Sequence, residues 1–199
     1  CTSCSQQSAS QVSVFIIAVD SLPSSAMDCP EETDSALLEG SAVQTLCNEG
    51  VRFTHAYAPS TLAVPSLISL LTGRYPSEHG VWHNGNQFLS AKHETLAEVA
   101  VRRGYRTALV SGGPPIWRKA GISQGFELFE DNVPIHVNKY YRPVEQSLGI
   151  LSEWMDGDAL SEPVFSIITV ADLQFPPRPI EGAEATAQGS RYEQQLLHI

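Results

Sequence analysis

The sequence contains no apolar run long enough to cross a bilayer as a helix, which takes about 20 residues. This excludes a helical membrane span within these residues. Hydrophobic residues nevertheless make up 42% of the 199 positions. A chain of this length and composition can form one globular domain with a sizeable core.

Basic residues are also scarce. Lys and Arg number 12 against 22 Asp and Glu, which gives a formal net charge of -10 and a pI near 4.9. Nonspecific binding to nucleic acid needs clustered Lys and Arg to displace counterions, so we expect no nucleic-acid partner. Apart from a short run at Glu31, Glu32 and Asp34 the acidic residues are scattered, which indicates a solvated acidic surface.

Cysteine is sparse as well, and no histidine cluster accompanies it. The four cysteines are Cys1, Cys4, Cys29 and Cys47. Without nearby histidines, the Cys-x-x-Cys at the start is a weak zinc or redox signal. A disulfide such as Cys29 to Cys47 can form in an oxidising compartment, but the sequence does not decide the connectivity.

The first eleven residues have no apolar pattern. They read "CTSCSQQSAS" and Gln11, a small and polar lead that begins with Cys rather than Met. This is typical of a processed bacterial lipoprotein, in which Cys1 carries the lipid and residues 1–11 form a flexible tether. We therefore expect a protein held on a membrane of the bacterial cell envelope, in the periplasm or at the outer membrane. The alternative is a sequence that merely begins at this cysteine.

Strands and helices alternate along the rest of the chain. The expected strands are Val12 to Val19, Val51 to Tyr57, 105–110 and 163–170, and the expected helices are 35–48, 65–73, 95–103, 143–154 and 191–199. The first strand is a near-continuous β-branched and aromatic run, typical of a strand buried on both faces of a sheet. The alternation predicts an α/β domain over residues 12–199, with a mainly parallel central sheet flanked by helices.

Two aspartates come directly after predicted strands. In a parallel α/β sheet, such positions face the crevice where ligands bind. Asp20 and Asp172 could therefore each supply an oxygen ligand to a hard divalent cation such as calcium or magnesium. The alternative for either residue is a turn or helix-capping aspartate.

The helix that opens near Pro65 is a candidate anion site. Free backbone N–H groups in a first helical turn, together with the helix dipole, favour sulfate or phosphate. Ser66 could add a hydroxyl and Arg74 a guanidinium, provided that both reach one pocket. The alternative is a buried core helix with Arg74 in a structural ion pair. His79 could also line a pocket, although a structural role is the more usual one.

A resemblance to a known family rests on the same region. The stretch "EGVRFTHAYAPSTLAVPSLISLLTGRYPSEHGVW" resembles the signature of the sulfatase family in the alkaline phosphatase superfamily. Four further stretches resemble family elements in family order: "VFIIAVDSL", "TLAEVAVRRGYRTALV", "GFELFED" and "FSIITVADLQFPPRP". The resemblance runs from about Val12 onward and implies an alkaline-phosphatase-like fold.

The catalytic positions that the resemblance implies are mostly substituted. The nucleophile, a Cys, Ser or Thr in the family, falls on Ala63, and the following arginine falls on Leu67. The second aspartate after the first strand is Ser21, and the histidine of the family's Asp-Pro-His stretch is Gln174. A methyl group cannot attack sulfur or phosphorus, so the resemblance predicts no catalytic residue.

The resemblance also places a lysine and a histidine of the family in the stretch "SGGPP", residues 111–115, which contains neither. Asp20, Ser66, Arg74 and Asp172 are what remains of the implied site. With so few ligands we expect no cofactor, and if a metal binds at Asp20 it would be a divalent cation such as calcium or magnesium.

The family's remaining metal ligands come from a strand beyond the point that this sequence reaches. The sheet would then keep an exposed edge that a protein partner could cover. Three functions stay open: a catalytically degenerate, lipid-anchored structural or interaction subunit, a metal-dependent sulfate or phosphate ester hydrolase completed by further residues or by an unusual nucleophile, and a non-catalytic binder of sulfated or phosphorylated ligands.

Overall fold

A computed structural model describes residues 11–22, 42–133, 140–156 and 162–174 of the chain. The expected tether at residues 1–11 lies outside this part except for Gln11, and the expected helix at 191–199 lies outside it entirely. No helix in the described ranges is both long and apolar enough to span a membrane.

The centre of the molecule is a parallel sheet of four strands in the order β1-β4-β2-β3. The strands are β1 (Val14–Val19), β2 (Arg106–Val110), β3 (Leu128–Glu130) and β4 (Val164–Val170). β1 and β4 are in register from Val14 opposite Phe165 to Val19 opposite Val170, so they end at the same level. The expected α/β fold with a mainly parallel sheet is confirmed, although the sequence patterns did not predict the short strand β3.

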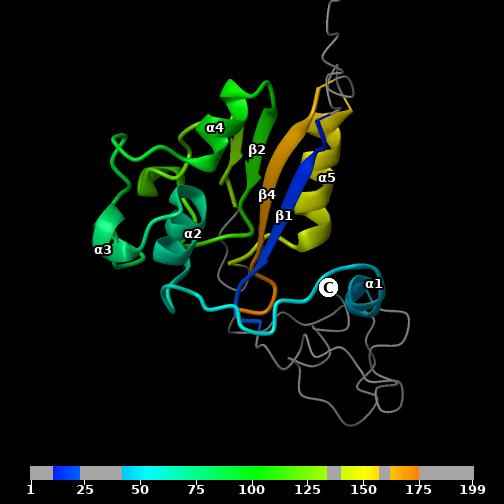
Figure 1. Cartoon of the computed structure of the whole chain (residues 1–199), viewed down its shortest axis with the longest axis horizontal. Coiled ribbons are helices and arrows are strands. Elements are labelled where there is room, and N and C mark those ends of the chain that lie inside the picture. Colours follow the sequence, from blue (N-terminus) through cyan, green and yellow to red (C-terminus); the bar gives the residue numbers. More distant parts are fainter. Residues whose placement is uncertain (1–10, 23–41, 134–139, 157–161, 175–199) are drawn as a thin grey trace, which may run out of the picture.

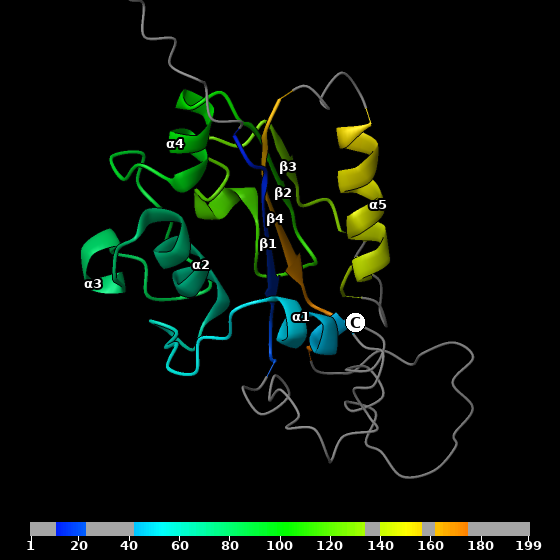
Figure 2. The same cartoon turned by 45° about the vertical axis from the view of Figure 1, so that its right-hand side comes forward.

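Helices cover both faces of this sheet. The described helices are α1 (Ala42–Glu49), α2 (Ala63–Thr72), α3 (Pro76–His79), α4 (Leu96–Arg102) and α5 (Val144–Met155), of which α2, α4 and α5 cover the sheet. Figures 1 and 2 show α2 and α4 on one face and α5 on the other. The core therefore has two parts, one in which α2 and α4 pack on Leu109 and Ile167 and one in which α5 packs on Val110 and Ile168.

The local signals for helix ends act as expected. Gly73 ends α2 in the left-handed conformation, with φ of 64°. Thr95 caps α4 by accepting the N–H of Glu98, and the Glu98 carboxylate accepts the N–H of Thr95 in return. α5 begins directly after Pro143.

Strand β1 differs from its expectation. We expected burial on both faces, but Phe15 is 53% exposed and Ile17 is 62% exposed. The reason is position, because β1 is the outer strand of the described sheet and pairs there with β4 alone. β4, which has a strand on each side and helices on both faces, is buried along its whole length.

The expected strand from Val51 to Tyr57 is wrong. These residues form a loop and a turn, and Val51, Phe53 and Tyr57 are each at least 80% exposed. Their alternating apolar pattern suits a strand, but a strand needs a neighbour to satisfy its backbone N–H and C=O groups. The described part of the chain supplies no such neighbour for this segment.

The expected helix over residues 35–48 is seen in its second half as α1, since the residues before Ala42 are outside the described ranges. Cys47 of this helix is disulfide-bonded. The other three cysteines lie outside the described part, so the pairing with Cys29 stays a prediction.

Candidate functional site

A cavity of about 210 Å³ lies at the carboxyl ends of the parallel strands. Its wall is formed by the end of β1, the end of β4, the start of α2 and the segment after β2. Ligands of parallel α/β proteins bind at this edge of the sheet, which is where the sequence predicted a site. Asp20, Ala63 and Ser66 line the cavity, whereas Arg74, His79 and Asp172 do not.

Both carboxylate oxygens of Asp20 already accept hydrogen bonds. The backbone N–H of Ser21 donates to Oδ1 at 2.9 Å, and the side-chain amide of Gln174 donates to Oδ2. The register of β1 and β4 makes this contact possible, because it brings residues 20 and 174 to the same end of the sheet. The amide nitrogen of Gln174 thus lies where a cation bound to Oδ2 would otherwise be.

The start of α2 places Ala63 on the cavity, with no hydroxyl or thiol at this position. The hydroxyl proton of Ser66 is not available to a ligand, because the hydroxyl donates it to the backbone oxygen of Ser60 at 2.7 Å. The sequence-implied nucleophile position is therefore the methyl group of a helix-starting alanine.

The first turn of α2 has few N–H groups left for an anion. The N–H of Val64 donates to Oδ1 of Asn84 at 3.0 Å, and that of Ser66 donates to the oxygen of Leu62 at 3.1 Å. Pro65 has no N–H at all. The free donors that an anion site requires at a helix start are thus mostly used within the protein.

Arg74 and Ser66 lie at opposite ends of the same helix. α2 has 10 residues and is therefore about 15 Å long, and Arg74 follows its terminal Gly73. The Arg74 side chain is half exposed and lies 3.9 Å from the carboxylate of Glu78. The structure does not bring these two predicted anion ligands together, and it places Arg74 in the surface ion pair that was its alternative.

His79 joins α3 to α2 and lies away from the cavity. The residue is 4% exposed, its Nδ1 accepts the N–H of Val81 at 3.1 Å, and its Nε2 is 3.0 Å from the hydroxyl of Ser69. Since Nδ1 accepts, Nε2 carries the proton and donates to Ser69. Burial is the main cause that lowers the pKa of His79, followed by the charge of His93. The neutral ring therefore has a structural role.

Asp172 lies in the turn that follows β4, where the N–H of Gln174 donates to the oxygen of Ala171 at 3.0 Å.

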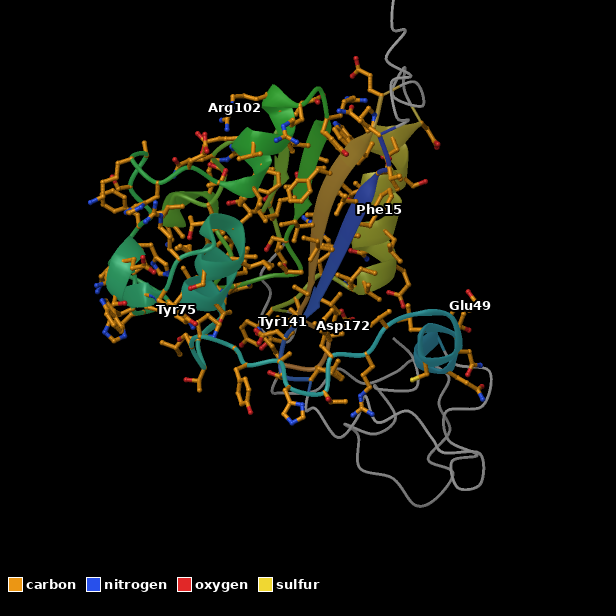
Figure 3. The ribbon with its side chains drawn as sticks, viewed as in Figure 1. Phe15, Glu49, Tyr75, Arg102, Tyr141 and Asp172 are labelled. Carbon is orange, nitrogen blue, oxygen red and sulfur yellow. The ribbon has the colours of Figure 1, made fainter. Side chains whose placement is uncertain are left out.

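Figure 3 shows Asp172 and Tyr141 at the carboxyl ends of the strands. The pKa of Tyr141 is raised first by burial and then by the negative charge of Asp20. Tyr141 gave no signal in the sequence, because it follows a segment with no recognised motif.

A second feature that the sequence did not reveal is the buried Arg142. Its guanidinium donates to the oxygen of Ser111 at 3.1 Å, to the oxygen of Asn132 at 2.9 Å and to the carboxylate of Glu130 at 2.7 Å. Its backbone N–H donates to the oxygen of Gly112 at 2.6 Å. Arg142 therefore fixes the beginning of the "SGGPP" segment, where the resemblance implied a catalytic lysine and histidine.

Gly112 in this segment has no room for a side chain. A Cβ atom at this position would overlap the carbonyl oxygen of Thr169 and lie 2.9 Å from the nitrogen of Ala171. The N–H of Gly112 also donates to the hydroxyl of Thr169 at 3.0 Å. The segment is packed directly against the end of β4 and forms one wall of the cavity through Gly113.

Most of the chain is similar to known proteins. The family model named Sulfatase matches residues 13–165. An N-acetylglucosamine-6-O-sulfatase of Bacteroides thetaiotaomicron is 24% identical over 173 residues, which are 86% of this chain and 28% of that protein.

Solved structures share the fold at low sequence identity. A protein of the alkaline phosphatase superfamily from Vibrio parahaemolyticus matches with a TM-score of 0.61 and 17% identity, over 94% of this chain and 47% of that one. A phosphonate monoester hydrolase of Agrobacterium radiobacter matches with a TM-score of 0.58 and 22% identity, over 80% and 40%. The present chain thus spans less than half the length of each of these relatives.

Proposed function

This chain belongs to the sulfatase family, and we propose that it is a non-catalytic member that serves as a lipid-anchored structural or interaction subunit. The observation that carries the proposal is the methyl group of Ala63 on the cavity, at the position where the resemblance places the nucleophile. Covalent catalysis needs a hydroxyl, thiol or aldehyde hydrate at that position, and alanine cannot be converted into any of them.

The metal that the family implies does not fit the described residues. Magnesium takes six ligands and calcium six to eight, mostly oxygens, and carboxylates supply the charge. The cavity offers a single carboxylate, that of Asp20, and no group of three or more Asp, Glu, His or Cys gathers anywhere in the described ranges. The side-chain amide of Gln174 also takes one of the acceptor positions on Oδ2 that a metal would need.

An interaction role is supported by two uncovered apolar surfaces. Phe15 and Ile17 pair with Ser166 and Ile168, so they point to the α5 face of the sheet, where they remain more than half exposed. Figure 3 shows Phe15 on the outer strand β1. The 51–57 segment has a strand pattern without a strand. A further polypeptide that adds a strand beside β1 would cover these apolar side chains in part and pair the backbone groups of β1 that no described strand pairs.

The lipid at Cys1 and the place in the bacterial cell envelope belong to the same proposal. They rest on the polar "CTSCSQQSAS" lead, which lies outside the described residues. The intact mass of the protein from its native source tests the anchor, because a diacylglyceryl group adds the mass of a thioether-linked glycerol and two acyl chains to the polypeptide. A mass without this increment would contradict the anchor and leave the catalytic part of the proposal standing.

Ester cleavage is the direct test of the catalytic part. The protein and its Asp20→Ala variant are incubated with 4-nitrophenyl sulfate, 4-nitrophenyl phosphate and a phosphonate monoester, with calcium, with magnesium and with a chelator. We expect release of nitrophenolate by the wild-type protein to equal that of the variant under every condition. Metal-dependent release that disappears in Asp20→Ala would overturn the proposal.

One alternative keeps support, namely a metal-dependent hydrolase that is completed by polypeptide beyond residue 199. The observation in its favour is that the chain spans 28% of its sulfatase relative. The same assay on any longer polypeptide from the native source decides between the two. The third option, a binder of sulfated or phosphorylated ligands, loses its basis because the first-turn donors of α2 are engaged and Arg74 lies at the far end.

A further inference from the structure

We propose that the cavity at the strand ends binds a small organic ammonium ion that carries an apolar group, and not an anion. The inference rests on the proposed absence of a catalytic metal at Asp20. Its basis is the chemistry of the wall, which combines one carboxylate with a mostly apolar lining. At about 210 Å³ the cavity is smaller than the roughly 300–1,000 Å³ of pockets for drug-sized ligands, so a small ligand is expected.

The charge of the wall excludes sulfate and phosphate. Asp20 is the one charged side chain among the described residues that line the cavity, and no Lys, Arg or His is among them. An anion that entered would meet a negative charge at short range with no cation to compensate it. In a partly desolvated site this repulsion is much stronger than in water.

The hydrogen-bonding capacity left in the cavity also points to a donor. The Ser66 hydroxyl uses its one proton on the backbone oxygen of Ser60 and keeps only acceptor capacity. An ionised carboxylate has about four acceptor positions, of which the Ser21 N–H and the Gln174 amide take two at Asp20. The remaining acceptor positions of Asp20 suit an ammonium group, which is a pure donor with a positive charge.

The rest of the ligand must be apolar. Leu67 and Ile116 are almost fully buried behind the cavity, and Leu70 is 43% exposed at its rim. Proline and valine side chains at positions 114 and 170 extend the same surface. An alkyl or aryl group of a few carbons would remove this surface from water while its ammonium group meets Asp20.

The experiment uses the whole chain and 2-phenylethylammonium as the probe, with binding followed by isothermal titration and by protein NMR shifts at pH 7. The neutral isostere 2-phenylethanol, inorganic sulfate and phenyl phosphate are titrated in parallel. We expect the ammonium probe to bind at least about tenfold more tightly than the alcohol, because a charged hydrogen bond contributes more than a neutral one. We expect no binding of either anion.

Two variants localise the effect. Asp20→Asn should lower the affinity for the ammonium probe about tenfold and leave that for the alcohol unchanged, whereas Glu153→Gln, an exposed carboxylate on α5 outside the cavity, should change neither. Leu70→Gln should weaken both probes, since it places a polar group at the apolar rim. Circular dichroism of each variant checks that the fold is retained.

Three outcomes overturn the inference: binding of sulfate or phenyl phosphate to the wild-type protein, equal affinity for the ammonium probe and the alcohol, or an Asp20→Asn variant that binds the ammonium probe like the wild type. If these occur while ester cleavage stays absent, only the ammonium site is refuted. If calcium or magnesium displaces the probe and ester cleavage appears, the proposed non-catalytic function fails as well.

Discussion

Replacing Arg142 by alanine should lower the free energy of unfolding by about 3 kcal/mol, because this side chain is 4% exposed and forms a largely buried ion pair with Glu130. The guanidinium donates hydrogen bonds to the backbone oxygens of Ser111 and Asn132 and to the carboxylate of Glu130. Truncation would leave three acceptors without their charged donor and would create a cavity beside the end of β2.

The magnitude follows from how much water can reach those acceptors afterwards. Removal of one partner of a buried ion pair costs about 3–5 kcal/mol. The Glu130 side chain is 30% exposed, so water can rehydrate part of its charge, and the lower end of that range applies. The Ser111 oxygen belongs to a fully buried residue and stays desolvated, which keeps the expected loss well above that of a surface pair.

Denaturant unfolding of the wild type and two variants tests this reasoning. The matched control is Arg102→Ala, which breaks the ion pair with Glu94 on the surface, where both side chains are more than half exposed. We expect a loss below about 1 kcal/mol for this control. Equal small losses for Arg142→Ala and Arg102→Ala would refute the assignment of Arg142 as the residue that holds the cavity wall.

Three further predictions concern the cavity wall, the buried histidine and the sheet edge. Gly112→Ala should lower the free energy of unfolding in denaturant by about 3 kcal/mol, because the new Cβ would overlap the backbone of Thr169. The control is Gly149→Ala in α5, where a Cβ meets no atom within 4 Å, and it should raise the free energy of unfolding by about 0.5–1 kcal/mol. Burial lowers the pKa of His79 below its ordinary 6.5, so this residue binds more protons in the unfolded state than in the folded state. Its contribution to the free energy of unfolding should therefore be complete above pH 6.5 and decrease as the pH falls toward the folded pKa. In unfolding measured from pH 7.5 to 5, His79→Gln should make this pH dependence weaker. Ile17→Lys should leave the free energy of unfolding of the isolated chain within about 0.5 kcal/mol of the wild type, measured by denaturant unfolding. A loss of about 2 kcal/mol or more would mean that β1 is covered.

The elements that local signals specify could be predicted from the sequence. The capping box at Thr95, the glycine stop at Gly73 and the opening of α5 after Pro143 all depend on neighbours within four residues, and all three appear in the structure. β1 and the 51–57 segment were less predictable. A run such as "VFIIAV" has the same composition in a central or an outer strand, and what covers it comes from distant parts of a chain.

The candidate site was predictable in its location and not in its contacts. Asp20 lies at the cavity because the rule for strand ends is general. The bond from Gln174 joins residues 154 positions apart, and no local pattern indicates it. The separation of Ser66 from Arg74 could have been foreseen, since a helix that runs from residue 65 to 73 already places its two ends more than two turns apart.

The substitutions at the strand ends act on one another. With Gln174 donating to Oδ2 of Asp20, a neutral amide takes one acceptor position of this carboxylate, and the negative charge remains. The described residues that line the cavity carry no positive charge that could hold a sulfate ester, so we expect a nucleophile introduced at position 63 to find no bound substrate among them. A serine restored at Ala63 alone would therefore face an apolar wall and a negative charge. Under the proposed functions, the residues at positions 20, 63 and 174 thus account both for the expected absence of ester cleavage and for the expected binding of a small ammonium ion.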